Sequence, residues 1–340
     1  MPYLPAVKRF VSASGARVYR IPCDALPNLS GRVYLVLDAG PPTLIDAGSG
    51  EDESIRHVLQ GLEAVRTEFH EPVRLSDVKR ILITHAHIDH FGGLRELLRE
   101  TKAEVAVHAL DSRQMTAYEE RAVLANRALA RFLRQAGVEP ERQTEVLRAF
   151  GYGAGRPRSV PVDFLLADGQ ELEGLRVVHT PGHSPGHVCI AVGDILISGD
   201  HILARTVPWQ WPESVAAHTG LSHYLDSLEK VRRLGGIEIA LGGHEPPVRD
   251  IPKRIGQIWD THQRRLDRLL EILGKAARPL TVSEITERMY SRQEGFHAML
   301  ALTDVGARVE YLDQRGQLAI ANLDEVQSQR EPVYRYRLAW

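Results

Sequence analysis

The feature that most constrains this chain is a cluster of histidines and one aspartate that directly follows the apolar run Ile81-Leu82-Ile83. The cluster has the pattern H-x-H-x-D-H and contains His85, His87, Asp89 and His90. A buried strand that ends in a turn can direct several neighbouring side chains toward one point, and neutral imidazole with carboxylate suits zinc and similar ions. A solvated, histidine-rich loop is the alternative, but four candidate ligands at a strand end favour a metal site.

The amino-acid composition limits which atoms can ligate a metal and indicates the cellular compartment. The chain has 340 residues, of which 43% are hydrophobic and 25% charged, as is typical of a globular protein. Its fifteen His and two Cys, Cys23 and Cys189, indicate nitrogen and oxygen ligands, no disulfide framework and a reducing cytoplasm. The net charge of -2 gives no general attraction to nucleic acid or to an anionic membrane. We find no signal-peptide core in residues 1–21 and no apolar run of roughly 20 residues, so we expect no membrane association.

The hydrophobic pattern predicts an α/β fold built in two similar halves. In the first half we expect strands at residues 17–21, 32–37, 43–45, 78–83 and 104–108, with helices at 54–69 and after Gly92-Gly93. In the second half we expect strands at residues 162–166, 175–179, 187–192, 195–198 and 238–241, with a helix at 221–234. Alternation of strands and helices indicates helices packed on sheets.

A helical insertion separates these halves at residues 111–160. We expect two helices, at 111–135 and 140–150, separated by Gly137. The segment holds nine Arg and six acidic residues, which gives it a net charge of +3. A basic cap over the site is one interpretation, and a solvated helical face is the other.

The last part of the chain, residues 256–340, predicts a small winged-helix-like domain beyond a catalytic domain of residues 1–255. We expect a long helix that ends at residue 273, helices at 281–290 and 303–314, and strands at 318–320 and 333–338. Winged helices often bind nucleic acid. Residues 259–340, however, hold twelve Lys and Arg against twelve Asp and Glu, so the positive charge of a nucleic-acid interface is absent. A packing or substrate-wall role is therefore favoured over a non-catalytic, DNA-binding regulator.

Three more polar clusters stand at the ends of expected strands, each with a candidate ligand. They are Thr180-Pro181-Gly182-His183, Ser198-Gly199-Asp200-His201 and Gly242-Gly243-His244. Glycine beside a ligand lets the backbone approach a metal closely and adopt unusual φ and ψ angles. Four such clusters in series make a specific pattern.

With these motifs, the chain resembles the metallo-β-lactamase superfamily from about residue 17 to residue 251. The resemblance implies an αββα sandwich and a dinuclear site, with His85, His87 and His183 on one metal, Asp89, His90 and His244 on the other, and Asp200 bridging both. It also implies that Asp46 holds the ligands by hydrogen bonds. We expect His187 to support the site and His179 to be a strand residue. His201 either contacts substrate or caps the turn.

This ligand set predicts hydrolysis. Two zinc ions, with iron or manganese as alternatives, would activate a shared water as a bridging hydroxide, which Asp89 would orient. Asp200 would take part by bridging the two ions. Neither Cys falls at a ligand position, so the Cys-containing site of many true β-lactamases is absent.

The substrate expectation comes from the same resemblance. The site looks like that of glyoxalase II, a thioesterase, although Glu245 follows the last ligand where that enzyme has an aromatic residue. We expect a (thio)ester hydrolase of a small or carrier-linked acyl substrate, and the chain itself, as a homodimer, is a second candidate partner. Five residues are candidates for substrate contact: Tyr118, Arg121, His201, Trp209 and Trp211. The basic insertion keeps a single-strand endoribonuclease or phosphodiesterase as the alternative, with nucleic acid not favoured.

Overall fold

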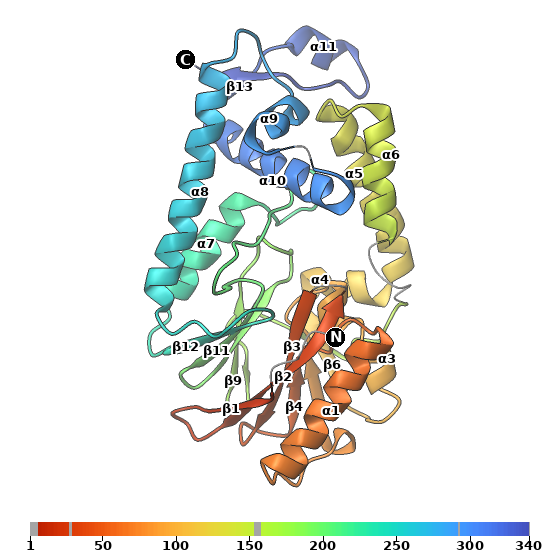
Figure 1. Cartoon of the computed structure of the whole chain (residues 1–340), viewed down its shortest axis with the longest axis vertical. Helices are drawn as coiled ribbons and strands as arrows, with labels where there is room; N and C mark the ends of the chain where they lie inside the picture. The colour runs from red at the N-terminus through yellow and green to blue at the C-terminus, as the bar shows by residue number, and fades with distance from the viewer. Residues whose placement is uncertain (1–5, 27–28, 153–157, 292, 340) are drawn as a thin grey trace. The chain divides into compact units, whose positions relative to one another are not determined.

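The computed structural model describes residues 6–26, 29–152, 158–291 and 293–339. The chain divides into two compact units (Figure 1). The first unit comprises Met1–Glu119, Ala154–Pro208 and Ser227–Ile255, and the second comprises Glu120–Gly153, Trp209–Asp226 and Gly256–Trp340. Among the described helices, none is both long enough and apolar enough to cross a lipid bilayer.

A seven-stranded sheet forms one layer of the first unit, in the order β1-β2-β3-β4-β5-β6-β7. Its strands are β1 (Lys8–Val11), β2 (Arg17–Leu26), β3 (Leu29–Leu37), β4 (Thr43–Ile45), β5 (Arg80–Leu82), β6 (Glu104–His108) and β7 (Phe164–Leu166). β1 to β4 pair antiparallel, which confirms the expected meander, and β4 to β7 pair parallel. We did not predict β1, because three of its four residues are exposed and two are charged, as is common in edge strands.

A five-stranded sheet forms the second layer, in the order β12-β11-β10-β9-β8. Its strands are β8 (Glu171–Leu172), β9 (Leu175–His179), β10 (Val188–Val192), β11 (Ile195–Gly199) and β12 (Ile239–Gly242). One buried cluster contains side chains from both sheets, among them Val36, Ile45, Val177 and Ile190. The two sheets therefore face each other across a common apolar core, and the expected α/β class is confirmed.

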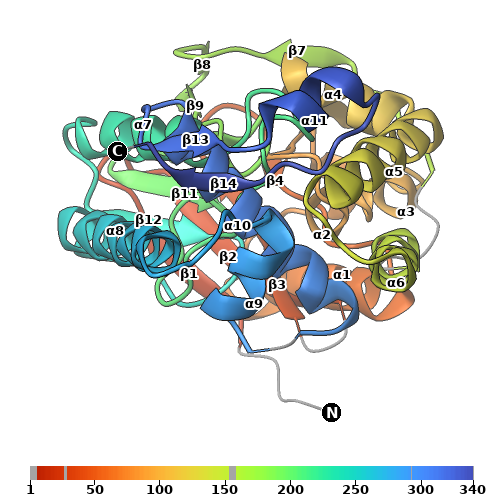
Figure 2. The same ribbon diagram turned by 90° about the horizontal axis from the view of Figure 1, so that it is seen from above.

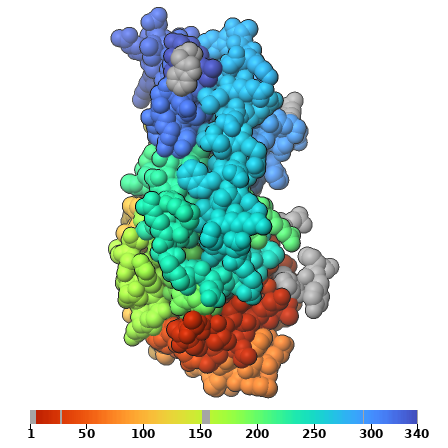
Figure 3. All heavy atoms as spheres, turned by 90° about the vertical axis from the view of Figure 1, so that its left-hand side faces the viewer, coloured from red at the N-terminus to blue at the C-terminus, as the bar shows by residue number. Residues whose placement is uncertain are grey.

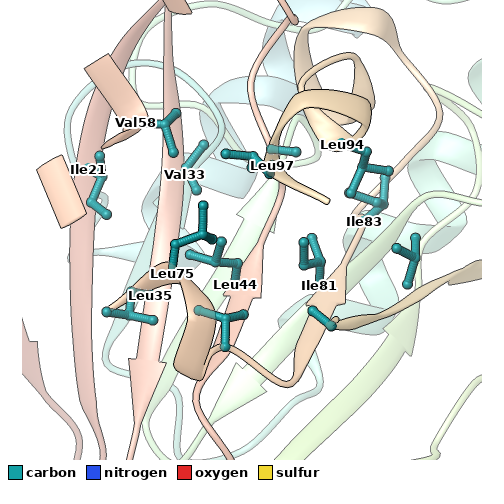
Figure 4. Close-up of a cluster of buried hydrophobic side chains, with 14 of the residues drawn as sticks. Ile21, Val33, Leu35, Leu44, Val58, Leu75, Ile81, Ile83, Leu94 and Leu97 are labelled. Atoms are coloured by element: carbon teal, nitrogen blue, oxygen red, sulfur yellow. The ribbon is translucent and has the colours of Figure 1, made fainter. Parts of the chain in front are cut away.

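The outer face of the first sheet carries a second core. Along β3, Tyr34 and Val36 belong to the cluster between the sheets, whereas Val33 and Leu35 point to the other side (Figure 4). This alternation is the two-residue period of a strand. Helix α1 (Asp52–Glu68) covers the outer face with Val58, Leu62 and Val65. Burial of each of these side chains contributes about 1.5–3 kcal/mol.

Three further helices follow strands of the first sheet in the chain. α2 (Ile88–Phe91) and α3 (Leu94–Leu97) follow β5, and α4 (Ala109–Thr116) follows β6. In the second half of the fold, α7 (Leu221–Arg232) is joined to β9 at its C-terminal part, where Lys230 Nζ donates to the backbone oxygen of His179 at 2.8 Å.

The predicted helix over residues 111–135 is two helices, α4 and α5 (Tyr118–Gln135). The helix breaks at Ala117, which has φ -137° and ψ 47°. The Tyr118 N–H then donates to Ser159 Oγ at 3.0 Å instead of to a carbonyl of the preceding turn. Ser159 lies 41 residues further along the chain, so the helix propensity of the residues around Ala117 does not predict this break.

The second unit is largely helical. Its helices are α5 and α8 (Ile251–Gly274), which both start in the first unit, with α6 (Pro140–Tyr152), α9 (Val282–Met289), α10 (Gly295–Asp313) and α11 (Leu323–Ser328). Its strands are β13 (Leu318–Ile320) and β14 (Tyr336–Leu338). α10 packs against α6 and α9, and β13 pairs antiparallel with β14 (Figure 2). Side chains of α8, in cyan, form part of the visible surface in Figure 3. The predicted last helix begins earlier, at Gly295, the last predicted strand is shorter, and α11 was not predicted.

Candidate metal centre

The histidine cluster lies on a short loop and a short helix, and the carboxylate of Asp46 hydrogen-bonds to both. β5 ends at Leu82, and the following Thr84 donates to Asp46 Oδ1 from its backbone N–H at 2.8 Å. Asp46 has a positive φ of 63°, so the carboxylate sits at a sharp turn after β4. His90 Nδ1 donates to Asp46 Oδ2 at 2.8 Å, and this bond leaves Nε2 as the acceptor nitrogen. The Asp46 carboxylate thus accepts hydrogen bonds from both Thr84 and His90.

The other three motifs bring their side chains to the same point. His183 follows β9, Asp200 follows β11 and His244 follows β12. Asp200 Oδ2 lies 3.7 Å from His183 Nε2, 3.6 Å from His90 Nε2 and 3.4 Å from His244 Nε2. All seven predicted ligand residues therefore converge within the first unit.

The donor atoms fall into groups that could hold a metal ion. They are His85 with His87 and His183, then His85 with His90 and Asp200, and then Asp89 with His90 and His244. His85 Nε2 lies 3.0 Å from His87 Nδ1, and His244 Nε2 lies 3.4 Å from Asp89 Oδ2. Such separations suit ligands placed about 2.0–2.2 Å from a shared ion.

Within the described part of the chain, two buried atoms of the centre have no hydrogen-bond partner, namely His90 Nε2 and Asp200 Oδ1. A buried polar atom without a partner is costly unless something outside the chain satisfies it. A cation between these imidazole and carboxylate groups would do so, and nitrogen with oxygen ligands suits zinc, iron and manganese. The residues present therefore fit a metal.

Charge and burial shift the pKa values of these side chains. Burial lowers the pKa of His85 well below its ordinary value, and His90 and His87 add to this effect. Burial opposes the charged form of His244, but Asp200 and Asp89 raise its pKa to about 10. Burial also opposes ionisation of Asp200, yet His244 and His90 lower the pKa of its carboxyl well below the ordinary range. At neutral pH this carboxyl is an anion, as a metal ligand must be.

His187 supports the Asp200 loop, in agreement with its expected supporting role. Its ring is fully buried and belongs to none of the metal-binding groups found among the described residues. The backbone N–H of Asp200 donates to His187 Nε2 at 3.1 Å, so the ring proton lies on Nδ1 and is donated to Thr180 Oγ1 at 2.8 Å. His179 is a residue of β9, as predicted.

The residues predicted to contact substrate belong to both units. Tyr118, half-buried, and His201, fully buried, belong to the first unit. Arg121, Trp209 and Trp211 belong to the second unit, where the two indole rings lie 5.0 Å apart. Their contacts with substrate stay predictions.

Two features of the first unit were not predicted from the sequence. Asp111, which it assigned to the helical insertion, is a buried carboxylate beside the ligand loops. Asp111 follows shortly after β6, which pairs with β5, and this position in the chain was the signal that could have indicated a role near the ligands. A further group that could hold a metal, Asp24 with Glu53 and His57, shares no residue with the motifs, and its members are half-buried. Acidic surface groups of this kind are common without an ion.

Comparison with known proteins identifies the family of the chain. The family model of the metallo-beta-lactamase superfamily matches residues 26–244. The "Probable metallo-hydrolase YqjP" of Bacillus subtilis (strain 168) is 25% identical over 288 residues, which is 83% of this chain and 87% of that protein. An "Atrochrysone carboxyl ACP thioesterase" of Aspergillus fumigatus is 24% identical over 278 residues, which is 76% of this chain and 68% of that protein.

The fold has a solved counterpart as well. The crystal structure of the metallo-beta-lactamase family protein TTHA1429 from Thermus thermophilus matches with a TM-score of 0.69 and 26% identity. The match covers 94% of this chain and 98% of that one. The family model spans more than half of the 340 residues and includes every predicted ligand. The chain therefore belongs to the metallo-beta-lactamase superfamily and is a hydrolase of that superfamily.

Proposed function

We propose that the protein is a metal-dependent hydrolase of thioesters or esters, acting on a small or carrier-linked acyl substrate. His85, His87 and His183 would hold one ion, Asp89, His90 and His244 a second, and Asp200 would bridge both. The observation that carries the proposal is the convergence of these seven side chains in three groups of donor atoms that are linked by His85 and His90. Zinc is the expected metal, with iron or manganese as the alternatives.

Bound metal ions would polarise the substrate carbonyl and lower the pKa of a water molecule. The residues of the chain supply binding and orientation. The carboxylate of Asp89 is half-buried and lies beside His244. In this position it can accept a hydrogen bond from the attacking water and so fix the direction of attack. Asp46 holds the His90 ring in one tautomer, so its Nε2 faces the centre throughout.

The cysteines support water as the nucleophile. Cys23 and Cys189 are both buried and free. Burial raises the pKa of the Cys23 thiol to about 11 and that of Cys189 to about 12. Because only a thiolate attacks efficiently, neither side chain is a nucleophile at neutral pH.

The thioester specificity is supported by a relative. The Aspergillus fumigatus protein is named an ACP thioesterase, and its likeness to this chain covers 76% of the sequence. A carrier-linked thioester matches this name. We also propose that residues 256–340 form a winged-helix-like domain, supported by the order α8, α9, α10, β13 and β14.

An assay panel tests the proposal. Metal-replete protein is incubated with acyl-coenzyme A thioesters, aryl esters and single-stranded RNA, and metal content is measured on the same sample. We expect thioester or ester turnover, and a fall in kcat of about 100-fold or more in Asp89→Ala. Glu100→Ala, which removes an exposed acid of the same unit, should retain full activity.

Two results would contradict the proposal. RNA cleavage that is lost in Asp89→Ala, without ester turnover, would identify a nuclease. A replete protein that holds less than one metal ion per chain would exclude metal-dependent hydrolysis.

A further inference from the structure

The three imidazoles His85, His87 and His183 come from loops that follow strands of different sheets. Two of them follow β5 of the seven-stranded sheet, and the third follows β9 of the five-stranded sheet. A main-chain hydrogen bond joins the loops at their base, where the Val188 N–H donates to the Thr84 oxygen at 2.8 Å. The relative position of the three imidazole rings therefore also depends on any contact that connects the two loops closer to the ligands.

Asp111 makes that second connection. It lies in the first turn of α4, and the residue is 3% exposed. Its Oδ2 accepts hydrogen bonds from the Ala86 N–H at 2.8 Å and from Ser184 Oγ at 2.9 Å. Its Oδ1 accepts one from the Gly186 N–H at 2.7 Å. One carboxylate thus joins the residue between His85 and His87 to the segment that follows His183.

We propose that Asp111 is a positioning residue, which clamps the two ligand loops together and thereby sets the metal affinity of the group His85, His87 and His183. The inference rests on the proposed function, because it takes this group to bind a metal. Asp111 offers no atom to the groups that could hold an ion among the described residues, so it acts through the loops alone.

The clamp requires a carboxylate. All three contacts are donors, and an ionised carboxylate offers acceptors only, whereas a protonated one also carries a donor O–H. Burial raises the pKa of Asp111, and the bonds from Ala86, Gly186 and Ser184 counteract this rise by favouring the anion. The positive end of the α4 dipole adds to the same effect.

The clamp also requires a glycine in the second loop. A Cβ built on Gly186 would lie 2.7 Å from Asp111 Cγ and 2.7 Å from its backbone nitrogen. The carboxylate therefore reaches the Gly186 N–H only because that residue has no side chain. Gly186→Ala disturbs the same contact from the opposite side.

Asp111→Asn is a sharp test, because an amide has one acceptor oxygen and one donor nitrogen. In one orientation its NH₂ would face the Gly186 N–H, and in the other it would face the Ala86 N–H. A donor then meets a donor in either case, so at least one bond between the loops is lost. Ser184→Ala removes a single bond and leaves both backbone contacts.

The experiment measures metal affinity by competition of Zn²⁺ with a chromophoric chelator, using the full chain. We expect affinity to fall about 10- to 100-fold in Asp111→Asn and in Gly186→Ala, and by less in Ser184→Ala. The Co²⁺-substituted variants should also show changed d–d absorption. Asp163→Asn is the matched control, since this exposed carboxylate accepts a backbone bond from Val105 at 2.8 Å in the same unit and touches neither loop.

The outcomes separate the two proposals. If wild-type protein binds metal and turns over ester while Asp111→Asn and Gly186→Ala bind metal as tightly as wild type, the clamp is overturned and the proposed function stands. If wild-type protein binds no metal, both fail. If Asp111→Asn does not fold, Gly186→Ala decides, and unchanged affinity in that folded variant overturns the clamp.

Discussion

Gly243 shows how closely the backbone approaches the candidate ligands. A Cβ at this position would lie 2.5 Å from His90 Cε1 and 2.7 Å from Asp200 Oδ1. Both atoms belong to buried groups held by other bonds, so they cannot move aside freely. We expect Gly243→Ala to displace them and to lower kcat/KM about 100-fold, because small misplacements of reacting groups cost that much. Steady-state kinetics and metal analysis of the purified variant measure the effect.

A matched control separates crowding of the ligands from the general effect of an added methyl group. Gly235 has nothing within 4 Å of an added Cβ. Gly235→Ala should therefore keep wild-type activity and metal content. Full activity in Gly243→Ala would show that this backbone position has no influence on the ligands.

Among the elements, the strands that carry the ligands could be predicted from sequence, and the contribution of Asp111 could not. β5, β9, β11 and β12 are apolar runs that end in polar motifs, and this signal is local. The burial of Asp111 depends on Ala86 and Gly186, which lie 25 and 75 residues away in the chain. The sequence predicted only that Asp111 belongs to a helical insertion, either a basic cap or a solvated face, because no local pattern shows which distant backbone will donate to it.

Helix α10, in the second unit, contains a buried ion pair. Arg308 Nη1 lies 2.6 Å from Asp304 Oδ2, and the Arg308 side chain is fully buried. Tyr290 also donates to this carboxylate, at 3.2 Å. We expect Asp304→Asn to lower the free energy of unfolding by about 3–5 kcal/mol, because the guanidinium would be left buried without a counter-charge. Urea denaturation followed by circular dichroism measures the change.

The same pair predicts a dependence on pH. Burial opposes ionisation of Asp304, but Arg308 and Arg265 lower the pKa of its carboxyl below the ordinary value. Its contribution to stability is therefore present above the ordinary pKa of an aspartate and is lost as the pH falls through the lowered pKa. The difference between wild type and Asp304→Asn should shrink in acid. Glu271→Gln, which breaks exposed ion pairs of α8, should leave the urea midpoint unchanged at any pH.

At the scale of the whole chain, the candidate ligands are distributed unequally. All seven belong to the first unit, and each group that could hold a metal among the described residues also lies there. A ligand that binds the folded state stabilises the structure that its site requires. Metal should therefore stabilise the sheets of the first unit and leave the helices of the second unit largely unaffected.

Hydrogen–deuterium exchange with and without a chelator tests this distribution. At a free metal concentration of about 1,000 Kd, binding adds about 4 kcal/mol to the opening free energy of structure that must be intact for binding. We expect amides of β5, β9, β11 and β12 to exchange faster after metal removal, while amides of α9 and α10 keep their rates. If amide exchange accelerated equally in both units, metal binding would instead stabilise the chain as one cooperative structure. The ligand loops would then open in the same reaction as helices that contribute no ligand.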